Sequence, residues 1–280
     1  MSLNIRKGLS LSIGELFLYI QSNIPHLSKA ASIDLLSFLV NVERKSVLAK
    51  LKEPILIDER AINSIELVKK GYPVSYLRKN HEFFGYEFYV DENVLIPRVE
   101  TEVLVEEVLK NVHKDKEYKI LDICTGSGCI LISLLKNLPN SFGVGIDIDF
   151  KALKIARLNI EKHSLENRGF LVNTDAFYID KCFNTRFDII TMNPPYVSRN
   201  SNYSSFIKYE PEIALFTGDD DLIFYKKMLF ILDKLCKRDG LIFFEIGFDQ
   251  SERLKLVYKD KNVRFVEDYF GNKRVMVWKN

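Results

Sequence analysis

Apolar side chains recur every three or four positions along the first 75 residues of the chain. SIGELFLYIQ and ASIDLLSFLVNVERKSVLAKL both show this spacing, which is typical of amphipathic helices. Asp58 is placed to cap a further helical run, DERAINSIELVKKG, which Gly71 ends. We therefore expect residues 1–75 to form a small helical domain.

The pattern changes after residue 75. HEFFGYEFYVDENVLI is rich in aromatic and β-branched residues and has Gly85 near its middle, which predicts a β-hairpin. We expect residues 76–97 to be a hairpin linker. PRVETEVLVEEVLKNV then begins at Pro97 with a helical pattern, and its early acidic residues favour the positive end of a helix dipole.

From residue 118 onward, apolar strand candidates alternate with amphipathic runs. The candidates are YKILDI, FGVGIDI, GFLVN, FDIITM, GLIFFEIG, VRFVED and RVMVWK. The last two are joined by the short YFGNK and read as an antiparallel hairpin at the end of the sheet. The alternation predicts an α/β fold for residues 98–280, a doubly wound, Rossmann-like, mostly parallel seven-stranded sheet covered on both faces.

Composition and charge narrow the functional classes. The chain of 280 residues is 47% hydrophobic and 28% charged, and its net charge of +2 argues against binding nucleic acid by charge alone. Residues 1–80 hold 12 Lys and Arg against 7 Asp and Glu, or +5, which leaves −3 for the remainder. This basic part can dock an acidic partner, although a solvated helical surface accounts for the charge as well.

Cysteine and histidine usage fits a reducing compartment. The four cysteines contain no CxxC pair and the four histidines are scattered, so neither a disulfide framework nor a zinc site is expected. MSLNIRKGLSLSIGELFLYI is interrupted by Glu15 and lacks the pattern of a signal peptide, and no apolar run is long enough to span a bilayer. We expect a cytoplasmic protein.

Candidate ligand-binding residues follow the first two strands of the predicted sheet. In LDICTGSG, Gly126 and Gly128 lie where a strand becomes a helix, although a tight turn without a ligand explains two glycines equally well. Asp147 ends the next strand in GIDID and is placed to accept both hydroxyls of a ribose. Asp149 reads instead as the N-cap of the following helix.

The third and fourth strands add two further groups at the same edge. In TDAF, Asp175 can accept from an adenine amino group, with Ala176 and Phe177 along the ring. No Lys-Ser/Thr pair follows the glycines, which disfavours a phosphate-binding loop, so an adenosine-containing cofactor is expected. The fourth strand then delivers NPPY, whose paired prolines make either a rigid turn or the wall of a pocket for a planar nitrogen group.

These stretches together resemble a known enzyme class. DICTGSG, GIDID, TDAF and NPPY, in this order, are similar to class I S-adenosylmethionine-dependent methyltransferases, and NPPY resembles members that methylate adenine N6 or a glutamine amide. GYPVSYLRKNHEFFGYEFYVDENVLIPRVETE, YEPEIALFTGDDDL, FEIGFDQ and DYFGNKRVMVWK resemble the HemK/PrmC family, the peptide chain release factor N5-glutamine methyltransferases. The resemblance covers residues 70–280 and departs at Cys124, where the family usually has glycine.

The resemblance implies S-adenosylmethionine as cofactor and release factors as protein substrates of an enzyme expected to be a monomer. The residues implied for the cofactor are Cys124, Thr125, Gly126, Ser127, Gly128, Asp147, Asp175, Ala176, Phe177 and Asn193. Those implied for the substrate are Asn193, Pro194, Pro195, Tyr196, Arg98 and Glu100, of which Asn193, Pro194 and Tyr196 are the catalytic candidates. For Arg98 and Glu100, a helix start with acids suited to its dipole is an equal alternative.

The chemistry of an amide explains why NPPY suits this reaction. The lone pair of an amide nitrogen is delocalised, so an enzyme should hold the NH2 group with acceptors such as the Asn193 side-chain oxygen and the Pro194 carbonyl. Prolines add no competing N–H donors, and Tyr196 can lie against the flat amide. A polar loop containing Asn202, Tyr203 and residues 209–211 is expected to close over the substrate.

Two other functions remain open at this point. NPPY suits a flipped adenine equally well, so an adenine-N6 methyltransferase on DNA or RNA is the alternative. Against it, the chain has no extra recognition domain, no strong basic patch and no zinc module, and nucleic-acid binding is not expected. A nucleotide-binding regulatory module without catalysis would predict a degraded NPPY, whereas the motif is intact.

Overall fold

The computed structural model describes residues 5–198 and 205–280. These form two compact units, one built from residues 5–80 with 205–209 and a larger one built from residues 81–198 with 210–280. The hairpin expected as a linker belongs to the larger unit by its contacts. Across both described ranges, no helix has the length and apolar character needed to cross a membrane.

The smaller unit is mainly helical, as its apolar spacing predicts, and has a hydrophobic core of its own. Its elements are β1 (Ser10–Ser12), α1 (Ile13–Asn23), α2 (Lys29–Val40), α3 (Arg44–Val47), η1 (Leu48–Lys50), β2 (Pro54–Leu56), α4 (Glu59–Lys69), α5 (Val74–Arg78) and η3 (Ser205–Tyr209). The periodicity did not reveal β1 and β2, which pair antiparallel over three residues each.

Caps decide where these helices begin and end. Asp58 accepts a hydrogen bond from the Ala61 N–H at 2.7 Å, which confirms the predicted start of α4. Asn41 adopts a left-handed conformation with φ of 51° and ends α2. The single helix that the pattern suggested over residues 31–51 is therefore broken into α2, α3 and η1.

The larger unit opens with the predicted hairpin. Strands β3 (His81–Phe83) and β4 (Tyr86–Phe88) pair antiparallel, and the two turn residues Phe84 and Gly85 both have positive φ. Helix α6 (Val99–Lys110) follows, starting two residues after Pro97. These elements pack against the same hydrophobic cluster as the central sheet.

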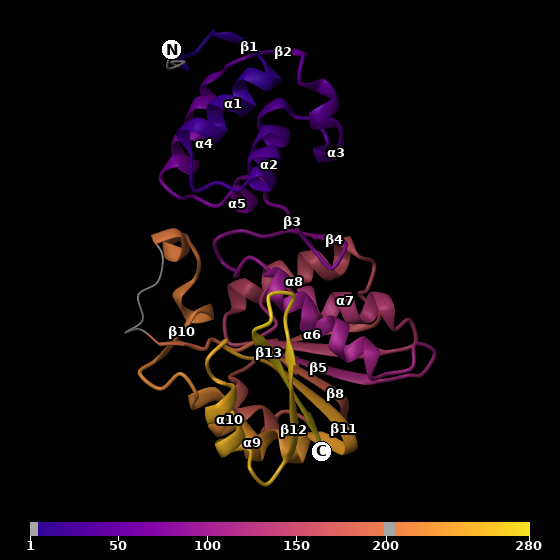
Figure 1. Cartoon of the computed structure of the whole chain (residues 1–280). Coiled ribbons are helices and arrows are strands. Elements are labelled where there is room, and N and C mark those ends of the chain that lie inside the picture. Colours follow the sequence, from indigo (N-terminus) through magenta and orange to yellow (C-terminus); the bar gives the residue numbers. More distant parts are fainter. Residues whose placement is uncertain (1–4, 199–204) are drawn as a thin grey trace. The chain divides into compact units, whose positions relative to one another are not determined.

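A seven-stranded sheet forms the centre of the larger unit and confirms the predicted fold class (Figure 1). Its strands are β5 (Lys119–Ile123), β6 (Phe142–Asp147), β7 (Gly169–Asn173), β8 (Phe187–Met192), β11 (Cys236–Glu245), β12 (Asn262–Glu267) and β13 (Lys273–Lys279). They lie in the order β12-β13-β11-β8-β5-β6-β7. The pairing is parallel except at β13, which is antiparallel to both of its neighbours.

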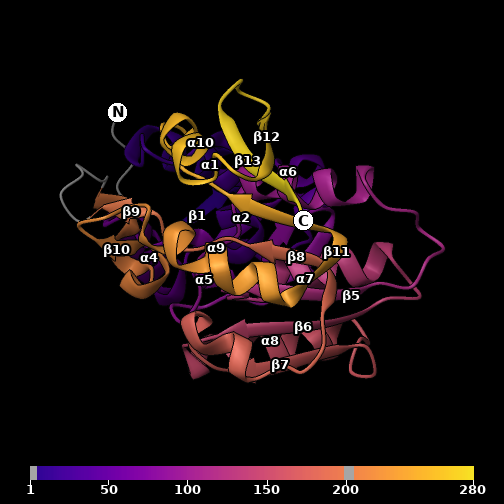
Figure 2. The same cartoon turned by 90° about the horizontal axis from the view of Figure 1, so that it is seen from below.

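Helices cover both faces of the sheet, as Figure 2 shows from below. One face carries α6, α7 (Cys129–Asn137) and α8 (Phe150–Lys162), and the other carries η2 (Ala176–Lys181), α9 (Ile223–Leu235) and α10 (Ser251–Val257). The short β9 (Val197–Ser198), η4 (Glu212–Ala214) and β10 (Phe216–Gly218) complete the unit, with β9 and β10 paired parallel. Each face buries its own hydrophobic cluster.

The order of the strands reverses direction at β5. This strand pairs with β6 on one side and β8 on the other, and the chain leaves β5 and β8 toward opposite faces of the sheet. In open α/β sheets, the crevice outside the carboxyl ends of strands at such a switch point is the usual ligand site. The loops after β5, β6, β7 and β8 meet there.

Candidate active site

The turn after β5 has an unusual backbone. Cys124, Gly126 and Gly128 have φ values of 59°, 53° and 81°, all in the left-handed region. A Cβ atom on Gly126 would meet nothing within 4 Å. Glycine is therefore favoured at this position by the left-handed backbone conformation and not by a lack of space. A Cβ on Gly128 would approach Ile132 at 3.2 Å and Ala156 at 3.4 Å, so this glycine also permits α7 and α8 to pack closely.

The non-glycine residue in this turn carries a conformational cost. Cys124 stands where the family usually has glycine, and its positive φ is one that favours glycine. A β-carbon in this region costs about 1–2 kcal/mol. Burial, and then the carboxylates of Asp147, Asp122 and Asp175, raise the pKa of the Cys124 thiol, which therefore stays neutral. We predict that a non-glycine residue in this conformation lowers the affinity for the cofactor.

A buried carboxylate supports the turn from below. Asp122, on β5, is fully buried and accepts hydrogen bonds from the hydroxyls of Thr125 at 2.6 Å and Thr191 at 2.7 Å. Burial raises the pKa of Asp122 to about 6, against the opposing effect of the two hydroxyl donors. Thr125 is expected to bind the cofactor, but its hydroxyl donates its hydrogen to Asp122.

The two strand-end aspartates also hold backbone N–H groups. Asp147 accepts from the Gly126 N–H and from the Asp149 N–H, each at 2.9 Å, so it ties the turn after β5 to the end of β6. Burial raises the pKa of Asp147, and these N–H groups partly offset the shift. Asp149 caps α8 by accepting from Lys151 at 2.8 Å, as predicted. Asp175 caps η2 by accepting from Phe177 at 2.9 Å.

These strand ends surround a cavity of about 260 Å³. The candidate residues that line it are Arg98, Cys124, Thr125, Gly126, Ser127, Asp147, Asp175, Ala176, Phe177, Asn193 and Pro195. Gly128, Pro194, Tyr196 and Glu100 are candidates that do not line it. The cavity thus collects residues from four strand ends and from the start of α6, and these candidates span 97 positions, from Arg98 to Pro195.

NPPY follows β8 directly and has side chains turned in different directions. Asn193 lines the cavity and donates from Nδ2 to the Thr101 hydroxyl at 3.4 Å. Tyr196 turns away and donates its hydroxyl hydrogen bond to Glu245 Oε1 at 3.0 Å. Burial, and then the Glu245 charge, raise the pKa of Tyr196 well above its usual range, so it remains a protonated donor. The expected contact of its ring with a substrate stays a prediction.

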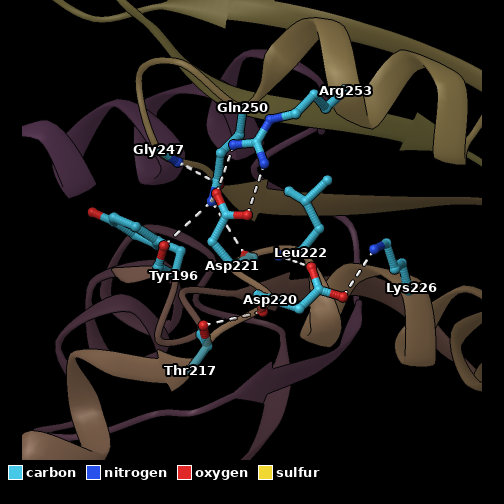
Figure 3. Close-up of polar contacts among 9 residues, drawn as sticks. All are labelled: Tyr196, Thr217, Asp220, Asp221, Leu222, Lys226, Gly247, Gln250 and Arg253. Atoms are coloured by element: carbon cyan, nitrogen blue, oxygen red, sulfur yellow. Dashed lines mark hydrogen bonds and ion pairs between the residues drawn. The ribbon is translucent and has the colours of Figure 1, made fainter. Parts of the chain in front are cut away.

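A second polar group holds the backbone of the same motif, as Figure 3 shows. Gln250 is 1% exposed and donates from Nε2 to the Tyr196 carbonyl at 3.3 Å and to the Asp221 carboxylate at 2.9 Å. Its Oε1 accepts from the Gly247 N–H at 2.8 Å. Arg253 pairs with Asp221 from the outside at 2.6 Å, and this pair is the largest cause of the lowered pKa of Asp221.

An ion pair fixes a further wall of the cavity. Arg98 donates to Glu210 Oε1 at 2.6 Å, and Glu210 Oε2 accepts from the Ile96 N–H at 3.1 Å. Glu210 is 7% exposed and precedes the lining residues of the segment 211–217. Arg98 is also the N-cap residue of α6, but its side chain makes no capping bond.

The other members of the expected closing loop, apart from Glu210 and Pro211, either belong to the smaller unit or are not described. Tyr209 belongs to the smaller unit, where its ring lies 5.1 Å from that of Tyr72. Asn202 and Tyr203 lie outside the described residues. Glu100 lies in the first turn of α6, where an acidic side chain interacts favourably with the helix dipole, the alternative to a role in substrate binding.

Four polar residues at the site were not predicted from the sequence: Asp122, Thr101, Glu245 and Gln250, of which Thr101 lines the cavity. FEIGFDQ, which contains the last two, contributed only to the resemblance. The available signal was an acidic residue inside an otherwise apolar strand, in ILDI and in LIFFEIG. Such residues are almost never buried unless they are paired or hydrogen-bonded.

Comparison with known proteins identifies the family to which the chain is similar. A family model, the methyltransferase small domain, matches residues 99–209. The release factor glutamine methyltransferase of Flavobacterium psychrophilum is 39% identical over 225 residues, covering 75% of this chain and 76% of that protein. The protein of the same name from Fusobacterium nucleatum is 35% identical over 255 residues, covering 88% of this chain and 70% of that protein.

Among solved structures, a methyltransferase from Pyrococcus furiosus is similar, with a TM-score of 0.51 and 17% identity. The match covers 73% of this chain and 93% of that one. At this level of identity the likeness bears on the fold alone.

Gln250 is predicted to contribute more to stability than Arg253, although both bind Asp221. Gln250→Leu leaves the Tyr196 carbonyl and the Gly247 N–H without their buried partner, which should cost about 1–3 kcal/mol. Arg253→Leu removes a solvent-exposed pair, worth about 0–1 kcal/mol. Urea unfolding followed by the fluorescence of Trp278, the single tryptophan, should show this difference. Equal losses would mean that Gln250 does not hold the motif.

Proposed function

The chain belongs to the family of release factor glutamine methyltransferases, and from this premise we propose the reaction that it performs. It transfers a methyl group from S-adenosylmethionine to the side-chain amide nitrogen, N5, of the glutamine in the Gly-Gly-Gln loop of a peptide chain release factor. The observation that carries the proposal is the position of Asn193, which lines the same cavity as Asp147 and Asp175. The acceptor for an amide and the carboxylates for a nucleoside thus lie on one cavity.

The groups on the cavity fit S-adenosylmethionine. Asp147 uses each carboxylate oxygen once for a backbone N–H, and a carboxylate offers about four acceptor positions, so it can still accept from ribose hydroxyls. Asp175 likewise retains acceptor positions for an adenine amino group. Phe177 and Phe224 line the cavity with ring centroids 4.8 Å apart and offer apolar surface to an adenine.

In this proposal the protein contributes orientation and acceptors. S-adenosylmethionine, when bound, supplies a methyl group on a positively charged sulfur that is already activated for displacement. Asn193 Oδ1 holds the glutamine NH2 so that its nitrogen keeps electron density toward the methyl group. The Pro194 carbonyl is the second acceptor that NPPY predicts, although Pro194 itself does not line the cavity. Holding the reacting atoms about 3–3.5 Å apart contributes much of the rate, and no general base is needed if the proton leaves after transfer.

A docking role for the smaller unit is part of the proposal. Every residue lining the cavity lies at position 93 or beyond, whereas residues 1–80 carry the positive excess of +5. One loop glutamine gives the cavity few contacts, so specificity for an intact release factor should come from a second surface. We assign that surface to the basic helical unit, which forms a core of its own. That the enzyme is a cytoplasmic monomer stays a prediction.

Asn193→Ala should remove most turnover and leave the cofactor bound. Losing an oriented acceptor in the transition state should lower kcat by about 10²–10³, by analogy with oxyanion-hole deletions. Asn140→Ala is the matched control, because Asn140 is exposed, donates to the Asp115 carbonyl and does not line the cavity. Rates on a purified release factor are measured for both. An Asn193→Ala enzyme as fast as the control would make NPPY a structural turn.

Asp147→Ala should weaken binding of S-adenosylmethionine. The variant loses a charged acceptor, worth about 1.5–3 kcal/mol per hydrogen bond, and also frees the Gly126 N–H from its carboxylate. Asp180→Ala serves as control, since Asp180 pairs with Lys234 and does not line the cavity. Calorimetric titration measures both affinities, and unchanged affinity in Asp147→Ala would contradict the assignment.

Reversing charge on the smaller unit should slow methylation of an intact release factor but not of a short Gly-Gly-Gln peptide. The reversed residues are three exposed lysines of that unit, Lys29, Lys52 and Lys70, each changed to Glu. If the partner is acidic, losing steering should lower kcat/KM by about 10-fold or more at low salt, and added salt should shrink the difference.

The matched control reverses the same number of charges on the larger unit. It changes three exposed lysines, Lys114, Lys116 and Lys259, to Glu. Docking through the smaller unit predicts that only the first variant loses activity on the intact factor. Equal losses in the two variants would assign the effect to net charge.

A further inference from the structure

A buried carboxylate lies beside NPPY and has no part in the reaction described so far. Glu245 is 1% exposed and ends β11, the neighbour of β8 in the sheet. Because Phe244 pairs with Met192 in the parallel register, the next residue on each strand, Glu245 and Asn193, leave the sheet side by side. The fold therefore delivers this carboxylate to the motif.

Two hydroxyl groups satisfy the carboxylate. The Thr101 hydroxyl donates to Oε2 at 2.5 Å and the Tyr196 hydroxyl donates to Oε1 at 3.0 Å. Burial raises the pKa of Glu245, the two donors and then the charge of Arg274 lower it, and Glu100 raises it. A buried carboxylate is rarely more stabilising than apolar side chains of the same volume, so stability alone gives little reason for it.

These hydrogen bonds all point the same way, from Asn193 through Thr101 to Glu245. An ionised carboxylate can only accept hydrogen bonds, so the Thr101 hydroxyl donates its single hydrogen to Glu245. Toward Asn193, the Thr101 oxygen can then only accept, and it receives the Nδ2 hydrogen at 3.4 Å. The other end of the Asn193 amide, Oδ1, is thereby directed away from Thr101.

We propose that Glu245, acting through Thr101, orients the Asn193 amide so that its oxygen faces the glutamine NH2 group. The inference rests on the proposed function, because it concerns the acceptor for that substrate. An amide with its ends exchanged would present an NH2 group to the substrate NH2 group and would repel it. Glu245 does not line the cavity, and Thr101 lines it with a hydroxyl that is bonded to both Glu245 and Asn193. Both are therefore positioning residues, which act on the substrate through Asn193.

The same carboxylate fixes the far end of the motif through Tyr196. One residue on β11 therefore governs both side chains that flank the two prolines. If Glu245 were neutral, its O–H would donate to one hydroxyl and reverse that link of the chain. Glu245→Gln imitates this change, because the amide brings two hydrogens in place of an acceptor.

The test compares isosteric and conservative variants in the full chain. Thr101→Val keeps the shape of the side chain and removes its hydroxyl, whereas Thr101→Ser keeps the hydroxyl. Glu245→Gln keeps the shape of the side chain and replaces one acceptor oxygen with an NH2 donor. Each is measured for kcat and KM with a release factor, for S-adenosylmethionine affinity by calorimetry, and for the unfolding midpoint.

We expect Thr101→Val and Glu245→Gln to lower kcat by about 10–100-fold, as loss of outer partners does at metal ligands, with cofactor affinity unchanged. Thr101→Ser should stay within a few-fold of the unchanged enzyme. A Thr101→Val enzyme with normal kcat overturns the inference. So does a Thr101→Ser enzyme as slow as Thr101→Val, because the loss would then come from packing.

A readout independent of turnover separates this inference from the proposed function. In ¹⁵N NMR spectra, the Asn193 side-chain NH2 signal is assigned by its loss in Asn193→Ala. Thr101→Val should shift this signal and speed its exchange with water, whereas Thr101→Ser should preserve it. If the unchanged enzyme methylates no release factor, the proposed function fails, and the NMR result still decides the orientation. An identical signal in Thr101→Val overturns the inference.

Discussion

The parallel pairing of β5 with β6 and β8 is the constraint on which the site depends. Parallel strands place their carboxyl ends at one edge, and the reversal of strand order at β5 opens a crevice there. The turn at Gly126, the carboxylate of Asp147 and the amide of Asn193 are distant in sequence but adjacent at this edge. The paired β11 adds Glu245 to the same edge by register alone. The order and direction of the strands therefore determine which residues meet at the candidate site.

Buried polar groups convert that topology into a fixed geometry. Asp122 holds the turn after β5 through Thr125, Gln250 holds the Tyr196 carbonyl, and Glu245 holds the Tyr196 side chain. Each is fully or almost fully buried and hydrogen-bonded, which is the condition under which burial of a polar group is tolerated. Such networks rigidify loops that would otherwise have no packed core of their own.

Strand and helix positions in the larger unit could be predicted because their apolar periodicity is strong. All seven strands and the capping roles of Asp58 and Asp149 were foreseen from local pattern and cap chemistry. The break at Asn41 was not, because a left-handed residue inside an apolar run leaves no mark on periodicity. The pairing of β1 with β2 was missed because three-residue strands are too short to show alternation.

Site residues could be predicted only where the residue type and its place at a strand end indicate a chemical role. A glycine turn, a strand-end acid and NPPY could be read directly, and most of these residues line one cavity. Gly128, Pro194, Tyr196 and Glu100 do not line it. For Tyr196 the reason is a tertiary contact, because its hydroxyl is bonded to Glu245. Partners such as Thr101 and Glu245 lie 144 positions apart in the chain, and nothing local links them.

The central claim is that the methyl acceptor is a glutamine amide of a release factor. It is tested most directly by incubating the full chain with isotope-labelled S-adenosylmethionine, a purified release factor and DNA together, and then locating the label by tandem mass spectrometry of the digested products. We expect label on the side-chain amide of the Gly-Gly-Gln glutamine and on no nucleobase. Label on adenine N6, with the release factor unlabelled, would contradict it.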